Sequence, residues 1–280
     1  MPTISNVEWD PALESFKGRS TTTYAAAAAA AATACASCQM PVTARTPLSL
    51  SVDVTGGTHG DGTEYFSFET RIYHRVCRAP ALTFIEGHSS PIEFTPRACR
   101  LILENRETGN ATAALVFTYL PMLSFREPGG ELTSALVTAL LRKGFQLAMS
   151  ADVGEMLRDS GPAAGDVVCP VSDRGLLTLR AGQAAMYHEQ LDPADPVDAA
   201  WLHAARGGAV LVIAGDNITF TSQGPDLDAA AQLGTLAAGM VPVTASDEDR
   251  PDRTTVRPYS ADGPPVSDGP PVTDGPPVTE

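Results

Sequence analysis

Lysine and aromatic residues are scarce in this sequence. Lys17 and Lys143 are the only lysines among 19 basic residues, and aromatic residues make up 6% of the 280. The formal net charge is −14 at pH 7, and residues 1–98, 99–241 and 242–280 are each acidic overall. Proteins bind phosphate backbones through clustered lysine and arginine, which release counterions. An acidic chain without a basic block is therefore not expected to bind DNA or RNA in general.

Long hydrophobic runs are also lacking. No apolar stretch approaches the roughly 20 residues that cross a bilayer. The nearest is residues 24–34, which precede Cys35 and resemble a lipoprotein export signal, but Glu8, Asp10 and Glu14 stand where such a signal is basic. We therefore expect a cytoplasmic protein without a membrane span, and no export as a lipoprotein.

The motifs of the common enzyme classes are absent as well. The sequence has no phosphate loop, no G-x-G-x-x-G after a strand, no G-x-S-x-G, no H-E-x-x-H and no deaminase pattern. Cys169 lies in an apolar strand, which favours a buried and inert thiol, and the spacing selects neither His188 nor His203 as a base for it. Whether the chain is an enzyme is left open, and we lean against it.

The alternative that the chain is an enzyme rests on Asp216. It follows the apolar run 209–214, and ligand-binding residues of open α/β sheets lie at the exits of such buried strands. Asp-Asn after a strand is also a common turn. A site in residues 99–241 near Asp216 is therefore kept as an alternative to a non-enzymatic protein.

Composition divides the chain into four parts. Residues 1–34 are predicted to be a low-complexity leader, whose alanine run 25–32 favours a helix but has no evident packing partner. Residues 35–98 are predicted to be a zinc-binding β-hairpin unit and residues 99–241 an α+β domain. Residues 242–280 form a predicted disordered tail, because its aspartate, proline and serine cannot bury enough apolar area to offset the entropy of ordering.

The predicted tail contains a repeat. Three copies of Asp-Gly-Pro-Pro-Val-Ser/Thr follow one another between residues 262 and 279. Consecutive prolines favour an extended, polyproline-like backbone. A repeat-expanded solubilising tail explains these copies better than a docking tether does.

Alternating apolar and polar residues predict two pairs of antiparallel strands. Residues 48–54 and 65–73 alternate strictly on either side of a glycine-rich loop, and residues 100–104 and 113–120 flank a turn-type cluster. Further strands are expected at 166–171, 176–180, 184–187 and 209–214. Helices are expected at 132–145, 152–157, 196–206 and 226–240. Because helices and strands interleave without a regular βαβ period, the predicted class is α+β, with α/β as the alternative.

Four residues have the spacing of a zinc site. Cys35 and Cys38 form a C-x2-C pair, and His74 and Cys77 form an H-x2-C pair. Zinc prefers four sulfur or nitrogen ligands in a tetrahedron, and each pair supplies two from one tight turn. Pairing strand 48–54 with strand 65–73 would bring the second pair back to the first. Cys99 is an alternative to His74, and a disulfide or free thiols are the alternatives to metal.

The pattern resembles the half-site of LIM-like and zinc-ribbon-like fingers, in which a thiolate turn precedes a hairpin and a His-x2-Cys pair follows it. The resemblance covers about residues 35–77, with a longer insertion than in LIM half-sites, and it also extends to phage and actinobacterial proteins. The excess of arginine over lysine fits a GC-rich genome of that kind. The resemblance implies a structural Zn²⁺ ion and no particular activity.

A closed site with four protein ligands leaves no position for a reactive water. The favoured function is therefore a non-enzymatic, zinc-stabilised structural or protein-interaction protein, whose partner is another protein. A zinc-dependent nucleic-acid-binding regulator is a further alternative, which requires that Arg71, Arg75 and Arg78 form an exposed face. Otherwise these arginines compensate the negative charge of the metal site.

Overall fold

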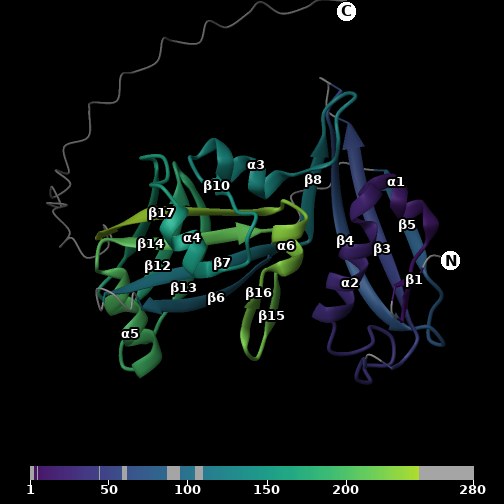
Figure 1. Cartoon of the computed structure of the whole chain (residues 1–280), viewed down its shortest axis with the longest axis horizontal. Coiled ribbons are helices and arrows are strands. Elements are labelled where there is room, and N and C mark those ends of the chain that lie inside the picture. The colour runs from purple at the N-terminus through teal and green to yellow at the C-terminus, as the bar shows by residue number, and fades with distance from the viewer. Residues whose placement is uncertain are drawn as a thin grey trace, which may run out of the picture. The chain divides into compact units, whose positions relative to one another are not determined.

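The computed structural model describes residues 3–4, 6–43, 45–58, 62–86, 95–104 and 110–245, all within one compact unit, Met1–Asp249. The class is α+β, as predicted: two sheets carry most of the ordered backbone, and short helices cover them (Figure 1). The hexapeptide repeats and the rest of the tail from residue 246 lie outside the described residues. The predicted part boundaries at residues 34, 98 and 241 stay predictions.

The first sheet is built around the predicted hairpin. Its strands are β1 (Thr3–Ile4), β2 (Val7–Glu8), β3 (Leu48–Thr58), β4 (Glu64–His74), β5 (Ala81–Glu86), β8 (Met122–Arg126) and β9 (Thr133–Ser134). The order is β1-β2-β3-β4-β8-β9, and β5 also pairs with β3. β3 and β4 are antiparallel, with Leu48 opposite His74 and Thr58 opposite Glu64. The alternation in the sequence thus predicted both the strands and their pairing.

The N-terminal segment packs against this sheet. It forms η1 (Pro11–Leu13), α1 (Glu14–Lys17), η2 (Gly18–Ser20) and α2 (Thr21–Ala31). Trp9, Leu13, Tyr24 and Ala25 are buried in the same core as the strand residues of β3 and β4. The prediction that the alanine run has no packing partner is wrong, because methyl side chains let a helix lie close to the sheet while Tyr24 fills the space between them.

The second sheet contains most of the remaining strands. They are β6 (Thr95–Glu104), β7 (Ala111–Leu120), β10 (Gln146–Leu147), β11 (Val167–Val171), β12 (Leu176–Ala181), β13 (Ala184–Gln190), β14 (Ala209–Gly215) and β17 (Leu236–Ala245). The order is β13-β12-β11-β17-β14-β7-β6, with β10 beside β17. β15 (Thr219–Thr221) and β16 (Gly224–Asp226) form a separate hairpin. The predicted pairing of residues 100–104 with 113–120 is confirmed by β6 and β7.

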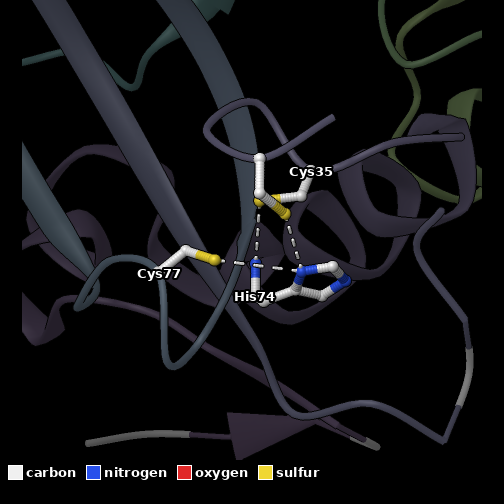
Figure 2. A group of neighbouring side chains, drawn as sticks. Cys35, His74 and Cys77 are labelled. Carbon is white, nitrogen blue, oxygen red and sulfur yellow. Dashed lines mark hydrogen bonds between the residues drawn. The ribbon is translucent and has the colours of Figure 1, made fainter. Parts of the chain in front are cut away.

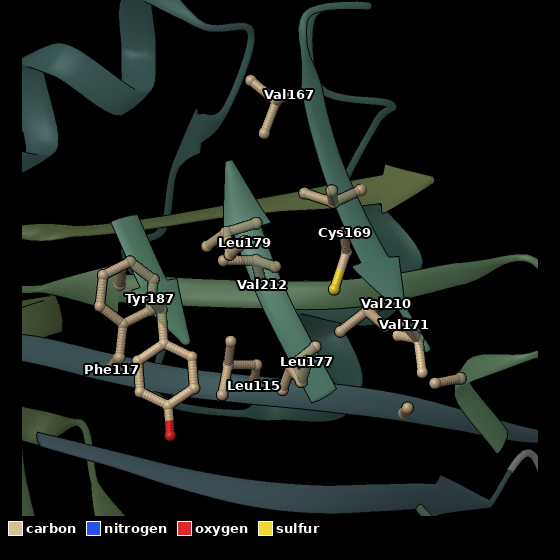
Figure 3. Packing of buried hydrophobic residues seen from close by; sticks show 14 of the residues in the cluster. Leu115, Phe117, Val167, Cys169, Val171, Leu177, Leu179, Tyr187, Val210 and Val212 are labelled. Carbon is tan, nitrogen blue, oxygen red and sulfur yellow. The ribbon is translucent and has the colours of Figure 1, made fainter. Parts of the chain in front are cut away.

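The second sheet curls until its two edge strands meet. Tyr187 of β13 stacks on Phe117 of β7 with ring centroids 6.2 Å apart (Figure 3). Arg100 of β6 forms an ion pair with Glu189 of β13 at 3.1 Å, and its guanidinium also reaches Asp198 at 2.7 Å. Side chains therefore join strands that lie at opposite ends of the hydrogen-bonded order.

Helices close the open sides of the curled sheet. They are α3 (Ala135–Arg142), α4 (Val153–Asp159), α5 (Pro196–Ala205) and α6 (Asp228–Gln232). Asp152 and Asp195 accept backbone hydrogen bonds at the starts of α4 and α5, as N-caps do. Trp201 of α5 is buried, and its indole N–H donates to the carbonyl of Ala114 at 3.1 Å.

One predicted helix is helical only in its first part and continues as a strand. Residues 226–240 were expected to be helical, but α6 ends at Gln232 and β17 begins at Leu236. Gly234 has φ +63°, a left-handed conformation that ends helices. At Gly239 a Cβ would lie 2.9 Å from the Phe145 ring, so the small residues here permit close packing in the middle of the sheet. β17 also runs into the first residues of the predicted tail, where Val243 pairs with Cys169.

Candidate metal centre

The two ligand pairs lie on two turns at one end of the first sheet. Cys35 and Cys38 follow α2, and His74 and Cys77 follow β4. In the part of the chain that the structure describes, these residues are the one group of histidine, cysteine and acidic side chains arranged to hold a metal ion. The strand pairing has carried the second pair back to the first, as the sequence predicted.

The distances fit a tetrahedral ion. One ligand atom from each residue lies within 4.8 Å of all the others. The Nδ1 atom of His74 is 3.4 Å from the sulfur of Cys38 and 4.0 Å from that of Cys77, and the side chains of Cys35, His74 and Cys77 converge in Figure 2. Zn–S bonds of about 2.3 Å and Zn–N bonds of about 2.0 Å separate tetrahedral ligand atoms by roughly 3.5–3.8 Å. The four side chains therefore need only a small contraction to close on zinc.

Backbone hydrogen bonds shape the first turn. The Cys35 N–H donates to the Met40 carbonyl and the Gln39 N–H to the Cys35 carbonyl, each at 2.9 Å. Gln39 has φ +60°, the left-handed conformation that a tight return of the chain requires. The Ala36 N–H donates to the Ile72 carbonyl at 2.9 Å, which ties this turn to β4.

The second turn continues directly from the hairpin. The Cys77 N–H donates to the His74 carbonyl at 2.8 Å, and the Arg75 N–H donates to the Pro47 carbonyl at 2.8 Å. Leu48 begins β3 opposite His74 at the end of β4. The H-x2-C pair is thus held by the strand register, independently of any ligand.

A backbone carbonyl determines which ring nitrogen of His74 carries the proton. The Nε2 atom of His74 is 3.2 Å from the carbonyl oxygen of Pro41, which can only accept, so Nε2 carries the proton and donates. Nδ1 then presents its lone pair to the cysteine sulfurs. Ligating histidines commonly donate their second ring N–H to a backbone carbonyl in this way.

The thiols differ in acidity. Burial raises the pKa of Cys35, but N–H groups of Cys38, His74 and Ser37 oppose this and lower it to about 6. Loss of solvent together with the neighbouring sulfurs of Cys38 and Cys35 raises the pKa of Cys77 to about 11. Adjacent thiolates repel one another, and a divalent cation removes that repulsion.

The three arginines near the site are engaged by side chains of this chain. Arg71 pairs with Asp53 at 2.6 Å and with Glu69 at 2.5 Å. Arg75 pairs with Glu8 at 2.7 Å. The guanidinium of Arg78 lies over the Tyr73 ring, 5.1 Å from its centroid, and donates to the Tyr73 hydroxyl at 3.1 Å.

The other cysteines lie elsewhere. Cys99 is in β6 of the second sheet, opposite Val116, and is not part of the metal group, so the idea that it replaces His74 is not supported. Cys169 is buried in β11, where burial raises its pKa to about 12, as expected for an inert thiol. His188 is on β13 opposite Thr178, and His203 is an exposed residue of α5.

Asp216 has a partner that the sequence gave no reason to expect. It is 6% exposed at the end of β14, where it bonds to Ser134 and lies near Lys17 of α1. Burial raises the pKa of Asp216 to about 6 and lowers that of Lys17 to about 8, each opposed by the charge of the other. Asn217, with φ +63°, turns the chain away, as the simpler interpretation of Asp-Asn predicted.

None of the helices among the described residues combines the length and apolar character needed to cross a bilayer. In comparisons with known proteins, the chain matches no protein-family model, no curated protein and no solved structure.

Proposed function

We propose that this chain binds one zinc ion through Cys35, Cys38, His74 and Cys77, and that the ion is structural in a protein that acts through protein contacts. The observation that supports the proposal is the convergence of three sulfurs and one imidazole nitrogen within 4.8 Å. All four donors come from turns that backbone hydrogen bonds hold in place.

The donor set favours zinc among the common metals. Three thiolates and one imidazole are soft or borderline ligands, which suit zinc and not calcium or magnesium, and Cys₃His is a frequent structural zinc set. Four protein ligands complete a tetrahedron and leave no open position for a substrate or a water. A structural ion therefore fits better than a catalytic one.

The ion would reinforce the hydrogen bonds that already connect two turns distant in the sequence. The first turn links α2 to β3, whereas the second ends the long β4 strand. Met40 and Val76 lie in these turns with 62% and 95% of their surface exposed. Zinc would hold two solvent-exposed apolar side chains in a fixed place, as a protein-contact surface requires.

The alternative functions gain less support from the described residues. The ion pairs of Arg71 and Arg75 with carboxylates reduce their capacity to bind phosphates, as a nucleic-acid reader would need. Asp216 is buried against Ser134 and Lys17, and it does not converge with Cys169, His188 or His203.

Metal analysis tests the proposal. The full chain, purified without added metal, should carry one zinc per molecule by mass spectrometry of its metals. Replacing zinc with cobalt should give the absorption bands of a tetrahedral thiolate site. Cys35→Ser and Cys77→Ser should lose the metal, whereas Cys99→Ser and Cys169→Ser, which alter cysteines outside the cluster, should retain it.

Zinc retained at full stoichiometry after a double Cys35→Ser and Cys77→Ser substitution would refute the site. A wild-type protein that takes up no zinc after reduction and refolding would refute it as well.

A further inference from the structure

One edge of β4 is free over part of its length. β3 pairs with the whole of β4, Glu64–His74, whereas β8 pairs with the other side of β4 only over Glu64–Phe68. β8 begins at Met122, because the residues just before it belong to β7 of the second sheet. Residues 69–74 of β4 therefore have no strand beside them on that side in the described ranges.

The register shows which backbone groups point to the free side. The Arg75 N–H donates to the Pro47 carbonyl at 2.8 Å, which makes the last pair of the β3–β4 ladder a non-hydrogen-bonded one. Hydrogen-bonded and non-hydrogen-bonded pairs alternate along an antiparallel ladder. Counting back from His74 in steps of two, Ile72 and Thr70 direct their N–H and C=O groups away from β3.

Neighbouring segments occupy both ends of this free edge. The Ala36 N–H donates to the Ile72 carbonyl at 2.9 Å, so the first turn of the metal centre covers one end. β8 covers the other end at Phe68. Between them, the N–H and C=O of Thr70 and the N–H of Ile72 have no hydrogen-bond partner among the residues that the structure describes. The sheet thus has a short gap with two donors and one acceptor.

A pocket of about 670 Å³ lies along the gap. Its lining includes Glu69, Thr70 and Ile72 of β4, and Met122 at the start of β8. Sites that bury a small ligand typically have volumes of about 300–1,000 Å³. A ligand therefore has room to reach the three backbone groups.

The two faces of the sheet differ at the gap. On the face of Thr70, whose hydroxyl hydrogen bonds to that of Tyr24, the pocket is lined by small residues of α2. On the other face, Asp53 and Glu69 line the pocket and share Arg71 as an ion-pair partner. Two carboxylates against one guanidinium leave an excess negative charge on this face.

We propose that the gap binds an extended peptide segment of a partner protein by strand addition, with a small side chain opposite Thr70 and a lysine or arginine opposite Glu69. An antiparallel segment would exchange two hydrogen bonds with Thr70 and accept a third from the Ile72 N–H. In strand addition, main-chain hydrogen bonds give affinity and the side-chain positions give specificity. Opposite side chains of neighbouring strands lie on the same face, so the basic residue would meet the excess negative charge.

The far side of the pocket also suits such a segment. Arg97 of β6 is part of the lining there, where its guanidinium would meet the carbonyl groups that the added segment directs away from β4. The inference rests on the protein-contact role proposed above, for which it names the chemistry of the partner, but it does not require the ion.

Titration of the full chain with the peptide acetyl-Thr-Val-Lys-amide tests this proposal by nuclear magnetic resonance. In antiparallel register its valine lies opposite Thr70, its lysine opposite Glu69, and its acetyl carbonyl faces the Ile72 N–H. Saturable binding should shift the amide signals of Thr70 and Ile72 most and slow their hydrogen exchange.

Methylated peptides provide a matched pair of controls. Methylation of the valine nitrogen should weaken binding about tenfold or more, because it removes the donor to the Thr70 carbonyl. Methylation of the lysine nitrogen, which points away from β4 in the same register, should leave the affinity nearly unchanged.

Variants of the protein test the two faces. Glu69→Gln should weaken binding of the lysine peptide several-fold and should not affect acetyl-Thr-Val-Met-amide, which has no charge at that position. Ala31→Leu narrows the pocket beside α2 and should weaken binding of both peptides, whereas Ala30→Leu makes the same change at an exposed position outside the lining and should not. Circular dichroism and metal analysis of the same samples would verify that each variant is folded and carries zinc.

A folded chain that carries zinc but binds neither peptide would overturn this proposal and leave the metal site standing. Equal affinities of the parent peptide and the peptide methylated at valine would overturn strand addition as well. Loss of zinc with peptide binding retained would count against the metal site alone.

Discussion

In the second sheet, β14 is buried on both faces. Val210 and Val212 pack on one side and Leu211 and Ile213 on the other, and all four are fully buried. In the first sheet, strand β5 leaves Phe84 about half exposed, and Met40 and Val76, in the two turns that carry the cysteine and histidine cluster, are largely exposed. Burial of apolar area contributes about 25 cal/mol per Å², so the second sheet has the larger source of stability.

The first sheet has its own buried core, and a cluster that could hold a metal ion lies at one end of it. The cysteine and histidine cluster lies where β4 ends, next to the segment that leads from α2 to β3. Small cores commonly need a metal or disulfide to be stable. The comparison teaches that the second sheet relies on apolar packing alone, whereas the first combines a buried core with a cluster of cysteine and histidine side chains that could hold a metal ion.

Metal removal should give the largest effect and should separate the two sheets. With zinc chelated, or with Cys35→Ser, the first sheet should lose several kcal/mol of stability, since structural zinc contributes on the order of 10 kcal/mol in small fingers. Hydrogen exchange should then accelerate at residues 69–74 of β4 and stay slow at residues 210–214 of β14.

Cys99→Ser is the matched control, because this cysteine lies in the second sheet outside the cluster. Its exchange pattern should equal that of the wild type. If chelation instead accelerated exchange equally in β4 and β14, the two sheets would unfold as one cooperative unit and the comparison would fail.

Truncation of one leucine in each sheet should give the next effect. Leu211 of β14 and Leu50 of β3 are both almost completely buried. Each change to alanine should cost about 2–5 kcal/mol, because it removes apolar contacts and leaves a cavity. Leu50→Ala should also weaken zinc binding, whereas Leu211→Ala should not.

Denaturant unfolding gives the stabilities, and competition with a chelator gives the zinc affinities. A loss of zinc affinity in Leu211→Ala as large as that in Leu50→Ala would show that the metal site depends on the second core too.

The hairpin and the metal cluster could be predicted because their signals are local. Strict alternation in residues 48–54 specifies one strand, and the C-x2-C and H-x2-C spacings each fit one turn. Antiparallel pairing of adjacent strands then leaves little choice about where His74 lies. The identity of the strands and the meeting of four ligands therefore followed from short-range patterns.

The predictions from the sequence were wrong where the composition of a segment does not indicate which face is buried. An unbroken alanine run shows no face that must be buried, so the packing of α2 could not be seen. The small residues of β17 favour a helix by propensity, but the sheet on both sides of the strand overrides that preference. Gly234 was the available signal that the helix ends before β17.

Contacts between distant segments that no local pattern links could not be predicted. Lys17 and Asp216 lie far apart in the sequence, and no motif links them. The same holds for the pocket of about 670 Å³, whose lining residues come from α2, β4, β6 and β7, among other segments. Only the folded backbone brings these residues together.

The buried pair of Lys17, beside the first sheet, and Asp216, in the second, should give a smaller effect on the free energy of unfolding. This effect depends on pH. Burial raises the pKa of Asp216 from 3.8 to about 6, so the unfolded chain loses this proton at lower pH than the folded chain does. The stability that protonated Asp216 contributes is thus present below pH 4 and is lost as the pH rises through about 6. A fall of about 2 kcal/mol is expected across that window.

Asp216→Asn should abolish this fall, because the amide does not titrate. Denaturant unfolding between pH 4 and 7 measures the difference. An exposed carboxylate provides the control: Asp173→Asn should keep the slope of the wild type, and an equal slope in the wild type and Asp216→Asn would contradict the assignment.

Replacing each of the two tryptophans with phenylalanine should give the smallest effect on stability. The same substitution then tests one core position beside each sheet. Trp201 of the second sheet donates its indole N–H to the Ala114 carbonyl, whereas the Nε1 of Trp9, beside the first sheet, has no hydrogen-bond partner among the described residues. Both are buried, so Trp→Phe removes similar apolar volume at each. Trp201→Phe also removes a buried hydrogen bond to the Ala114 carbonyl, whereas Trp9→Phe removes an unsatisfied donor. Trp201→Phe should therefore cost about 1 kcal/mol more than Trp9→Phe by denaturant unfolding, and equal costs would show that the bond to Ala114 adds nothing to the second core.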